Sequence, residues 1–157
     1  MMASNAGAED EAYLLAIKWL GRRSLTGHEI YERLARRGID HPPDLLKRLQ
    51  DGGWQSDARV VEQELAEARR QAWGPGRVAG RLRRRGVSAV MAAEAVARLS
   101  DDEVRQLAEH ETRRLTQQGY DTARIARYLE RRGFPASVIW KVVDGLEAVG
   151  GDSPTPR

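Results

Sequence analysis

The chain has 157 residues, with 26 Lys plus Arg, 23 Asp plus Glu and a net charge of +3, so one domain or a short array of small units is expected. Cysteine is absent, which excludes disulfide bonds, thiolate nucleophiles and cysteine-ligated zinc. The chain has no apolar run of about 18 residues, and its first ten residues lack the basic-then-apolar pattern of a secretory signal. We therefore expect a cytoplasmic protein that does not span a membrane.

The first predicted repeat covers residues 11–50. A helix over residues 11–21 is followed by Thr26 and Glu29, whose spacing is that of a capping box and starts a second helix. This second helix ends at Gly38, because glycine adopts the left-handed conformation of a C′ residue without a Cβ penalty. A third helix begins after Pro42-Pro43.

The second predicted repeat covers residues 57–99. A helix over residues 57–73 leads into the turn Gly74-Pro75-Gly76, the next helix ends at Gly86, and a third begins after Ser88. Residues 69–85 contain seven arginines and no acidic residue. This is the most basic part of the chain, and its flanks are acidic.

The third predicted repeat covers residues 100–148. Ser100 and Glu103 have capping-box spacing at the start of a helix over residues 101–118, the middle helix ends at Gly133, and a third begins after Pro135. Residues 1–10 and 149–157 are predicted to be flexible tails.

The three repeats are in register. Gly38 and Gly86 are 48 residues apart, and Gly86 and Gly133 are 47 apart. An apolar residue precedes each glycine by four positions and another follows it directly, as a Schellman motif requires. These pairs are Leu34 with Ile39, Leu82 with Val87, and Leu129 with Phe134. Thirteen residues before the glycines stand Leu25, Trp73 and Tyr120, which we expect to anchor the start of each middle helix.

Strand patterns are lacking, so the predicted fold is all-α, with three tandem three-helix repeats that form an elongated, curved array. A unit of about 47 residues is too small for a large core of its own, so we expect neighbouring units to bury each other's apolar faces.

The arginines of residues 69–85 and those at the ends of the other two middle helices are the candidate binding residues, because a basic stripe suits phosphates or an acidic protein groove. They are Arg36, Arg37, Arg69, Arg70, Arg77, Arg81, Arg83, Arg84, Arg85, Arg131 and Arg132. Solvated arginines that interact favourably with the helix macrodipole are the alternative, above all for the first and third repeats.

No catalytic, metal or cofactor motif is recognisable. His28, His41 and His110 lack metal-ligand spacing and are expected on the surface. The acidic run at Asp101 is explained by the start of a helix, where negative charge is favourable. Trp19, Trp54, Trp73 and Trp140 are expected in core or junction packing. We predict a protein that is not an enzyme.

The repeat segments resemble those of the RecX family, the modulators of the RecA recombinase. The matching segments are Leu34-Ala35-Arg36-Arg37-Gly38-Ile39, Gly74-Pro75-Gly76-Arg77-Val78 with Leu82-Arg83-Arg84-Arg85-Gly86-Val87, and Tyr128-Leu129-Glu130-Arg131-Arg132-Gly133-Phe134. The chain departs from the family pattern at Gln55, where a leucine is usual, and at Val60-Val61, where an aromatic residue and an alanine are usual. This departure concerns the packing of the first and second repeats.

The resemblance implies three tandem three-helix repeats and binding in the groove of the RecA–DNA filament. It also implies inhibition of filament growth, ATPase and recombinase activity, in DNA repair and the SOS response. The expected partners are the RecA filament and, as an open question, single- or double-stranded DNA phosphates, and the chain is expected to be a monomer. An independent helical DNA-binding module is one alternative, and a HEAT-like scaffold with two helices per repeat is another.

Overall fold

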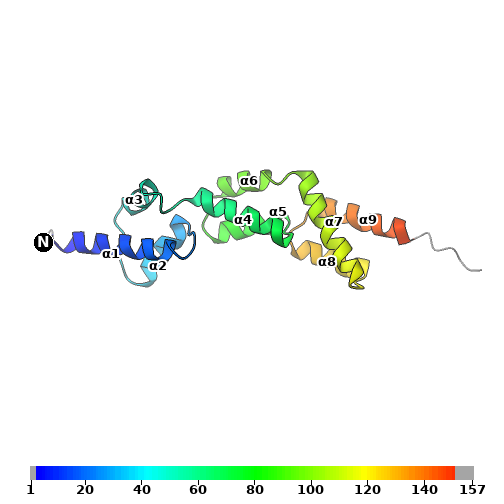
Figure 1. Ribbon diagram of the computed structural model, residues 1–157, viewed down its shortest axis with the longest axis horizontal. Helices are drawn as coiled ribbons and strands as arrows, with labels where there is room; N and C mark the ends of the chain where they lie inside the picture. Colours follow the sequence, from blue (N-terminus) through cyan, green and yellow to red (C-terminus); the bar gives the residue numbers. More distant parts are fainter. Residues whose placement is uncertain (1–2, 151–157) are drawn as a thin grey trace, which may run out of the picture. The chain divides into compact units, whose positions relative to one another are not determined.

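A computed structural model describes residues 3–150 of the protein. Over this range the chain forms nine α-helices and no strand (Figure 1). In chain order they are α1 (Ala3–Leu20), α2 (Gly27–Arg36), α3 (Leu45–Asp51), α4 (Asp57–Gln71), α5 (Pro75–Arg84), α6 (Ala89–Ala97), α7 (Asp101–Gln117), α8 (Thr122–Arg131) and α9 (Ala136–Gly150). The predicted all-α fold with three helices per repeat is confirmed, and the two-helix alternative is wrong.

The first helix is longer than predicted. α1 begins at Ala3, whereas the sequence pattern indicated a helix from Glu11 after a flexible tail. The added segment is rich in alanine, which has the highest helix propensity. At the other end α9 continues to Gly150, and the remainder of the predicted C-terminal tail, residues 151–157, lies outside the described residues, as do residues 1–2.

The middle helix of every repeat ends at its predicted glycine. Gly38, Gly86 and Gly133 have φ angles of +66°, +82° and +85°. The amide of the following residue donates to the carbonyl five positions earlier in each case, as in Ile39 N to Leu34 O at 3.0 Å. This is the predicted Schellman hydrogen bond, and it gives the three helix ends the same shape.

The caps predicted at the starts of α2 and α7 are confirmed, with one difference. Thr26 accepts from the amide of Glu29 and the Glu29 carboxylate accepts from the amide of Thr26, so the capping box at α2 is complete. At α7 the Ser100 hydroxyl accepts from the amide of Glu103. The Glu103 carboxylate instead accepts from Arg69, because an arginine within reach gives a charge-assisted bond.

The chain packs as two compact units. Unit 1 extends to Glu64 and includes Leu82–Ala89, whereas unit 2 consists of Leu65–Arg81 and the chain from Val90 onward. Each unit therefore contains one outer repeat and part of the second repeat. The three-repeat domain boundaries stay a prediction, since the boundary between the units falls within α4 and α5.

Each unit has its own apolar core. In unit 1, α1 packs against α3, and the buried cluster consists of Ala12, Ala16, Trp19, Leu25, Ile30, Leu34, Leu45 and Leu49. In unit 2, α7, α8 and α9 pack side by side (Figure 1). Their buried residues include Val104, Ala108, Leu115, Ile125, Leu129, Phe134 and Val142.

Two of the four tryptophans are not in the core. Trp19 and Trp73 are buried as predicted, but Trp54 is 42% exposed and Trp140 is 66% exposed. Trp140 lies on α9 and is exposed although Val142 and Val143 of the same helix are buried, and Trp54 follows the left-handed Gly53 that closes α3. Trp54 and Trp140 are therefore not core residues, and the junction packing that the prediction also allowed stays a prediction.

Candidate functional site

Two arginines of unit 2 are stacked on one tryptophan. Ala72 ends α4 with a φ of +50°, and the amide of Trp73 then donates to Ala68 O at 2.9 Å. This turn places the indole under α5, whose first turns carry Arg77 and Arg81. Their Cζ atoms lie 5.0 and 4.4 Å from the ring centroid. A stacked guanidinium is oriented in advance and still has N–H groups at its edge for an anion.

The same stack occurs in the third repeat. The Cζ atom of Arg124 lies 4.4 Å from the centroid of the Tyr120 ring. Tyr120 and Arg124 stand 47 positions after Trp73 and Arg77. Arg124 is exposed, and sequence analysis did not select it, although the aligned register of the repeats is a signal that could have found it.

Unit 1 holds an equivalent pair of arginines over Trp19. The Cζ atoms of Arg33 and Arg37 lie 5.6 and 5.4 Å from the ring centroid. Arg36 and Arg37 are exposed at the end of α2, as predicted. Each described unit therefore presents stacked arginines at its surface.

Five of the remaining predicted arginines fall into two groups. Arg83, Arg84 and Arg131 are exposed and could reach a partner without breaking a described contact. Arg69 pairs with Glu103 and Arg70 pairs with Glu67. These surface ion pairs are exchangeable, because exposed pairs contribute little to stability.

Arg85 does not belong to the surface that the sequence pattern predicted. Its side chain is 18% exposed and lies 2.9 Å from the Glu29 carboxylate and 3.0 Å from that of Glu64. It also donates to the main-chain oxygen of Ser24 at 2.9 Å. The hydrogen bond that Arg85 donates to Glu29 raises the pKa of Arg85. Arg85 thus joins the first and second repeats within unit 1.

Arg132 has the same role within unit 2. Its guanidinium donates to the main-chain oxygen of Gln71 and lies 5.4 Å from the centroid of the Tyr128 ring. Its own carbonyl accepts from the amide of Gly74 at 2.8 Å. Arg85 and Arg132 both stand directly before the C′ glycine of their repeat, and each is partly buried by its bond to the segment that precedes a middle helix, α2 for Arg85 and α5 for Arg132.

A buried polar network in unit 2 stabilises the packing of α7 against α8. Glu111, which is 6% exposed, accepts from Arg114 at 2.8 Å and from the Tyr128 hydroxyl at 3.0 Å. Burial acts to raise the pKa of Glu111, but hydrogen bonds from Arg114 and Tyr128, with the charges of Arg114 and Arg132, lower it below its ordinary value. Burial, followed by the contact with Glu111, raises the pKa of Tyr128. The polar atoms of this network bind each other.

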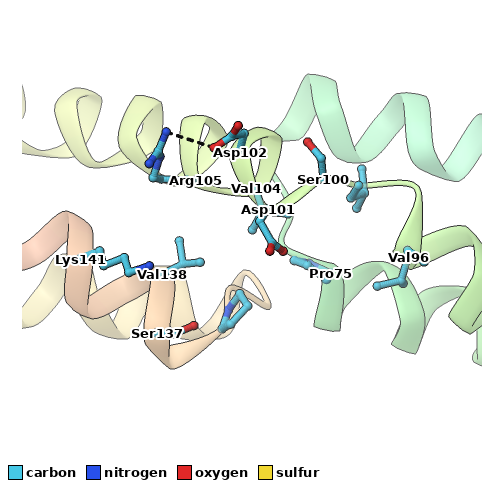
Figure 2. Close-up of a pocket in the computed structure, with 13 residues that line it drawn as sticks. Pro75, Val96, Ser100, Asp101, Asp102, Val104, Arg105, Ser137, Val138 and Lys141 are labelled. Carbon is cyan, nitrogen blue, oxygen red and sulfur yellow. Dashed lines mark ion pairs between the residues drawn. The ribbon is translucent and has the colours of Figure 1, made fainter.

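A pocket of about 650 Å³ lies in unit 2, where the first turn of α7 faces α9 (Figure 2). Its charged side chains have mixed sign, and Asp102 pairs with Arg105 at 3.2 Å (Figure 2). Asp101 and Asp102 stand at the predicted acidic start of α7. Within residues 3–150 no group of three or more acidic or histidine side chains is placed to hold a metal ion. His28, His41 and His110 are exposed, as predicted.

Comparison with known proteins identifies the family. The chain is 34% identical to regulatory protein RecX of Halorhodospira halophila, over 87% of this chain and 89% of that protein. It is 36% identical to regulatory protein RecX of Deinococcus radiodurans, over 82% of this chain but only 64% of the longer relative. The chain belongs to the RecX family.

The RecX fold is also found by comparison of structures. The crystal structure of RecX from Lactobacillus salivarius matches 91% of this chain and 99% of its own, with a TM-score of 0.78 at 18% identity. No family model matches the sequence. The RecX relatives are regulatory proteins by name, which agrees with the lack of a recognisable catalytic motif. In the described part of the chain no helix is both long and apolar enough to cross a bilayer.

The departure from the usual RecX pattern at Gln55 has a structural explanation. Gln55 is 2% exposed, and its amide nitrogen donates to Leu25 O at 3.2 Å and to Asp57 Oδ1 at 2.7 Å. Its amide oxygen accepts from Gln50 at 3.0 Å. A hydrogen-bonded amide thus occupies the position of the usual leucine, and Val60 and Val61 are buried beside it in the chain.

Proposed function

We propose that this RecX-family chain is a non-catalytic regulator that binds the RecA recombinase filament in the cytoplasm. In this role it inhibits filament extension, ATP hydrolysis and recombinase activity, and so modulates DNA repair and the SOS response. The observation that carries the proposal is the group of arginines on α5, where the half-buried Arg77 and Arg81 are held over Trp73.

The chemistry of this surface suits an acidic protein groove. The guanidinium groups are stacked on a ring, so they lose little side-chain entropy when a carboxylate binds. Their exposed neighbours Arg83 and Arg84 add positive charge, which speeds association with an acidic partner.

The test is reversal of Arg81, Arg83 and Arg84 to glutamate. We expect the folded triple variant to inhibit RecA-catalysed ATP hydrolysis more weakly, with a half-inhibitory concentration at least about tenfold higher. The reason is that the new glutamates would repel the acidic groove of the partner. A matched control reverses Lys18, Arg22 and Arg113, which are exposed outside the stacks. Full inhibition by the first variant would remove the role proposed for α5.

Direct DNA binding is the alternative function, and exposed arginines such as Arg83 and Arg84 are equally suited to phosphate contacts. Binding to DNA alone should then weaken steeply with salt. A gel-shift titration without recombinase separates the two functions. Tight, sequence-selective binding of naked duplex would favour the DNA-binding module over the filament regulator.

A further inference from the structure

The arginine and glycine that close each middle helix form a docking end, and two of the three docking ends are occupied. The first occupied end is Arg85-Gly86 in unit 1. The Arg85 guanidinium donates to Ser24 O at 2.9 Å, and the Arg85 carbonyl accepts from the Thr26 hydroxyl at 2.5 Å. A Cβ atom on Gly86 would lie 2.3 Å from the Cβ of His28, so a side chain would not fit there.

The second occupied end is Arg132-Gly133 in unit 2. The Arg132 guanidinium donates to the main-chain oxygen of Gln71, and the Arg132 carbonyl accepts from Gly74 N at 2.8 Å. The glycine is again in close contact, since a Cβ on Gly133 would lie 2.2 Å from the amide nitrogen of Arg77.

Both docking ends recognise the same kind of structure. In each case the guanidinium binds a main-chain carbonyl that precedes a helix, and the arginine carbonyl binds a donor at the start of that helix. The bare glycine then packs against the first helical turn, α2 in unit 1 and α5 in unit 2. In unit 1 a carboxylate of the same turn, that of Glu29, adds a charge-assisted bond.

The third docking end, Arg37-Gly38, is exposed. Gly38 has a φ of +66°, and its amide donates to Ala35 O at 3.0 Å, as the amide of Gly86 does to Arg83 O. The backbone is thus shaped like that of the occupied ends. Nothing lies within 4 Å of a Cβ built on Gly38, and Arg37 is exposed above Trp19.

We propose that Arg37-Gly38 binds the first turn of a helix on a protein partner, in the way that the two occupied ends bind α2 and α5. A pocket of about 410 Å³ adjoins Gly38 and is lined in part by Glu9, Glu11 and Asp40. An acidic rim complements the partial positive charge of a helix N-terminus. The matching partner has a main-chain carbonyl ahead of the helix for Arg37 and a carboxylate in the first turn.

The starts of the middle helices in a second copy of this chain do not fit this description. The starts of α2 and α5 already bind the docking ends Arg85-Gly86 and Arg132-Gly133 of their own chain. In the third repeat, Asp121 at the start of α8 takes the place that Thr26 and Gly74 have in the first and second repeats. An ionised carboxylate has no proton to donate to the Arg37 carbonyl. The Cβ of Asp121 also conflicts with the close approach seen at Gly74, where a Cβ would lie 2.4 Å from the backbone of Gly133.

The inference rests on the proposed function in taking the RecA filament as the partner, and adjacent arginines provide the test. Arg36 and Arg37 are both exposed, but only Arg37 has the register of Arg85 and Arg132. In co-sedimentation with RecA filaments on single-stranded DNA, we expect Arg37→Ala to weaken binding about tenfold, the size of a lost charge-assisted hydrogen bond. Arg36→Ala should change binding less than about threefold, since exposed charges contribute little.

Arg22→Ala is the second control, because Arg22 is exposed but lies outside the stacks and outside the docking end; it should retain binding. If Arg36→Ala and Arg37→Ala weaken binding to the filament equally, the proposed docking end is wrong, and the arginines act only through their positive charge. A wild-type chain that does not sediment with the filament would overturn the proposed function and the choice of partner. Self-association that Arg37→Ala abolishes in sedimentation velocity would identify a second copy as the occupant and overturn the inference.

Discussion

The Arg85 guanidinium and the Glu29 carboxylate lie 2.9 Å apart, although 56 positions separate them in the sequence. Glu29 also completes the capping box of α2, so one carboxylate both starts a helix of the first repeat and holds the end of a helix of the second. Burial acts to raise the pKa of Glu29, but hydrogen bonds from Arg85 and the Thr26 amide, with the Arg85 and Arg23 charges, lower it.

Removal of the Arg85 side chain should destabilise the protein. Arg85→Ala leaves Glu29 and the buried Glu64 without this cation, and breaking such a pair costs about 3 kcal/mol. The neighbouring Arg84 is exposed, so Arg84→Ala should change stability by less than about 0.5 kcal/mol. Urea unfolding followed by circular dichroism measures both changes. Equal midpoints for the two variants would contradict the junction role of Arg85.

Alanine at two equivalent glycines separates backbone strain from packing. Gly38 and Gly133 both have positive φ, so either substitution costs about 1 kcal/mol through the left-handed conformation. A Cβ on Gly133 would also meet Arg77 N at 2.2 Å, whereas a Cβ on Gly38 meets nothing. Gly133→Ala should therefore cost about 2 kcal/mol more than Gly38→Ala, because the repeats must move apart. Valine at position 133 should also be destabilising.

Thermal melting of the two alanine variants gives the difference directly. If both lower the melting temperature equally, the close contact of Gly133 with α5 contributes nothing to stability.

Stability should fall when the protein is acidified, in part through Glu111. Hydrogen bonds and positive charge outweigh burial and keep the pKa of Glu111 below its ordinary value of 4.5 in the folded state. The unfolded chain therefore takes up a proton first as the pH falls, so the contribution of Glu111 is fully present above about pH 4.5 and is lost below it.

Glu111→Gln removes this titration. We expect the variant to be less stable than the wild type at pH 7, and the difference to narrow between pH 5 and pH 3 as Glu111 is protonated in the wild type. Urea unfolding of both proteins at each pH measures this difference in the free energy of unfolding. A difference that stays constant over this range would show that the pKa of Glu111 is the same in the folded and unfolded states.

Restoring the leucine that is usual in the family should not improve the packing of the first repeat against the start of α4. Gln55→Leu removes the amide that binds Leu25 O and Asp57 Oδ1. The unmade hydrogen bonds should cost about 1 to 2 kcal/mol. Gln55→Glu is the paired variant, since it keeps the shape but loses the donor. If Gln55→Leu is more stable than the wild type in urea, the hydrogen bonds of the Gln55 amide make no net contribution to stability.

Local sequence was sufficient to predict the helices and their ends. The glycines at 38, 86 and 133 and the Thr26–Glu29 capping box act through hydrogen bonds within a few residues. Such bonds depend on the segment itself, so spacing and residue type predicted them. The start of α1 was missed because its first turns carry no recognisable cap and no apolar stripe.

The roles of the arginines were decided by the tertiary structure. Arg37, Arg85 and Arg132 each follow another arginine and precede a C′ glycine, so the local sequence gives no basis for separating them. Arg85 and Arg132 are docked because a segment 61 residues earlier offers a carbonyl acceptor, whereas nothing lies within 4 Å of a Cβ built on Gly38 beside Arg37. Contacts between distant segments depend on which surfaces the packing brings together, and that information is absent from any single repeat.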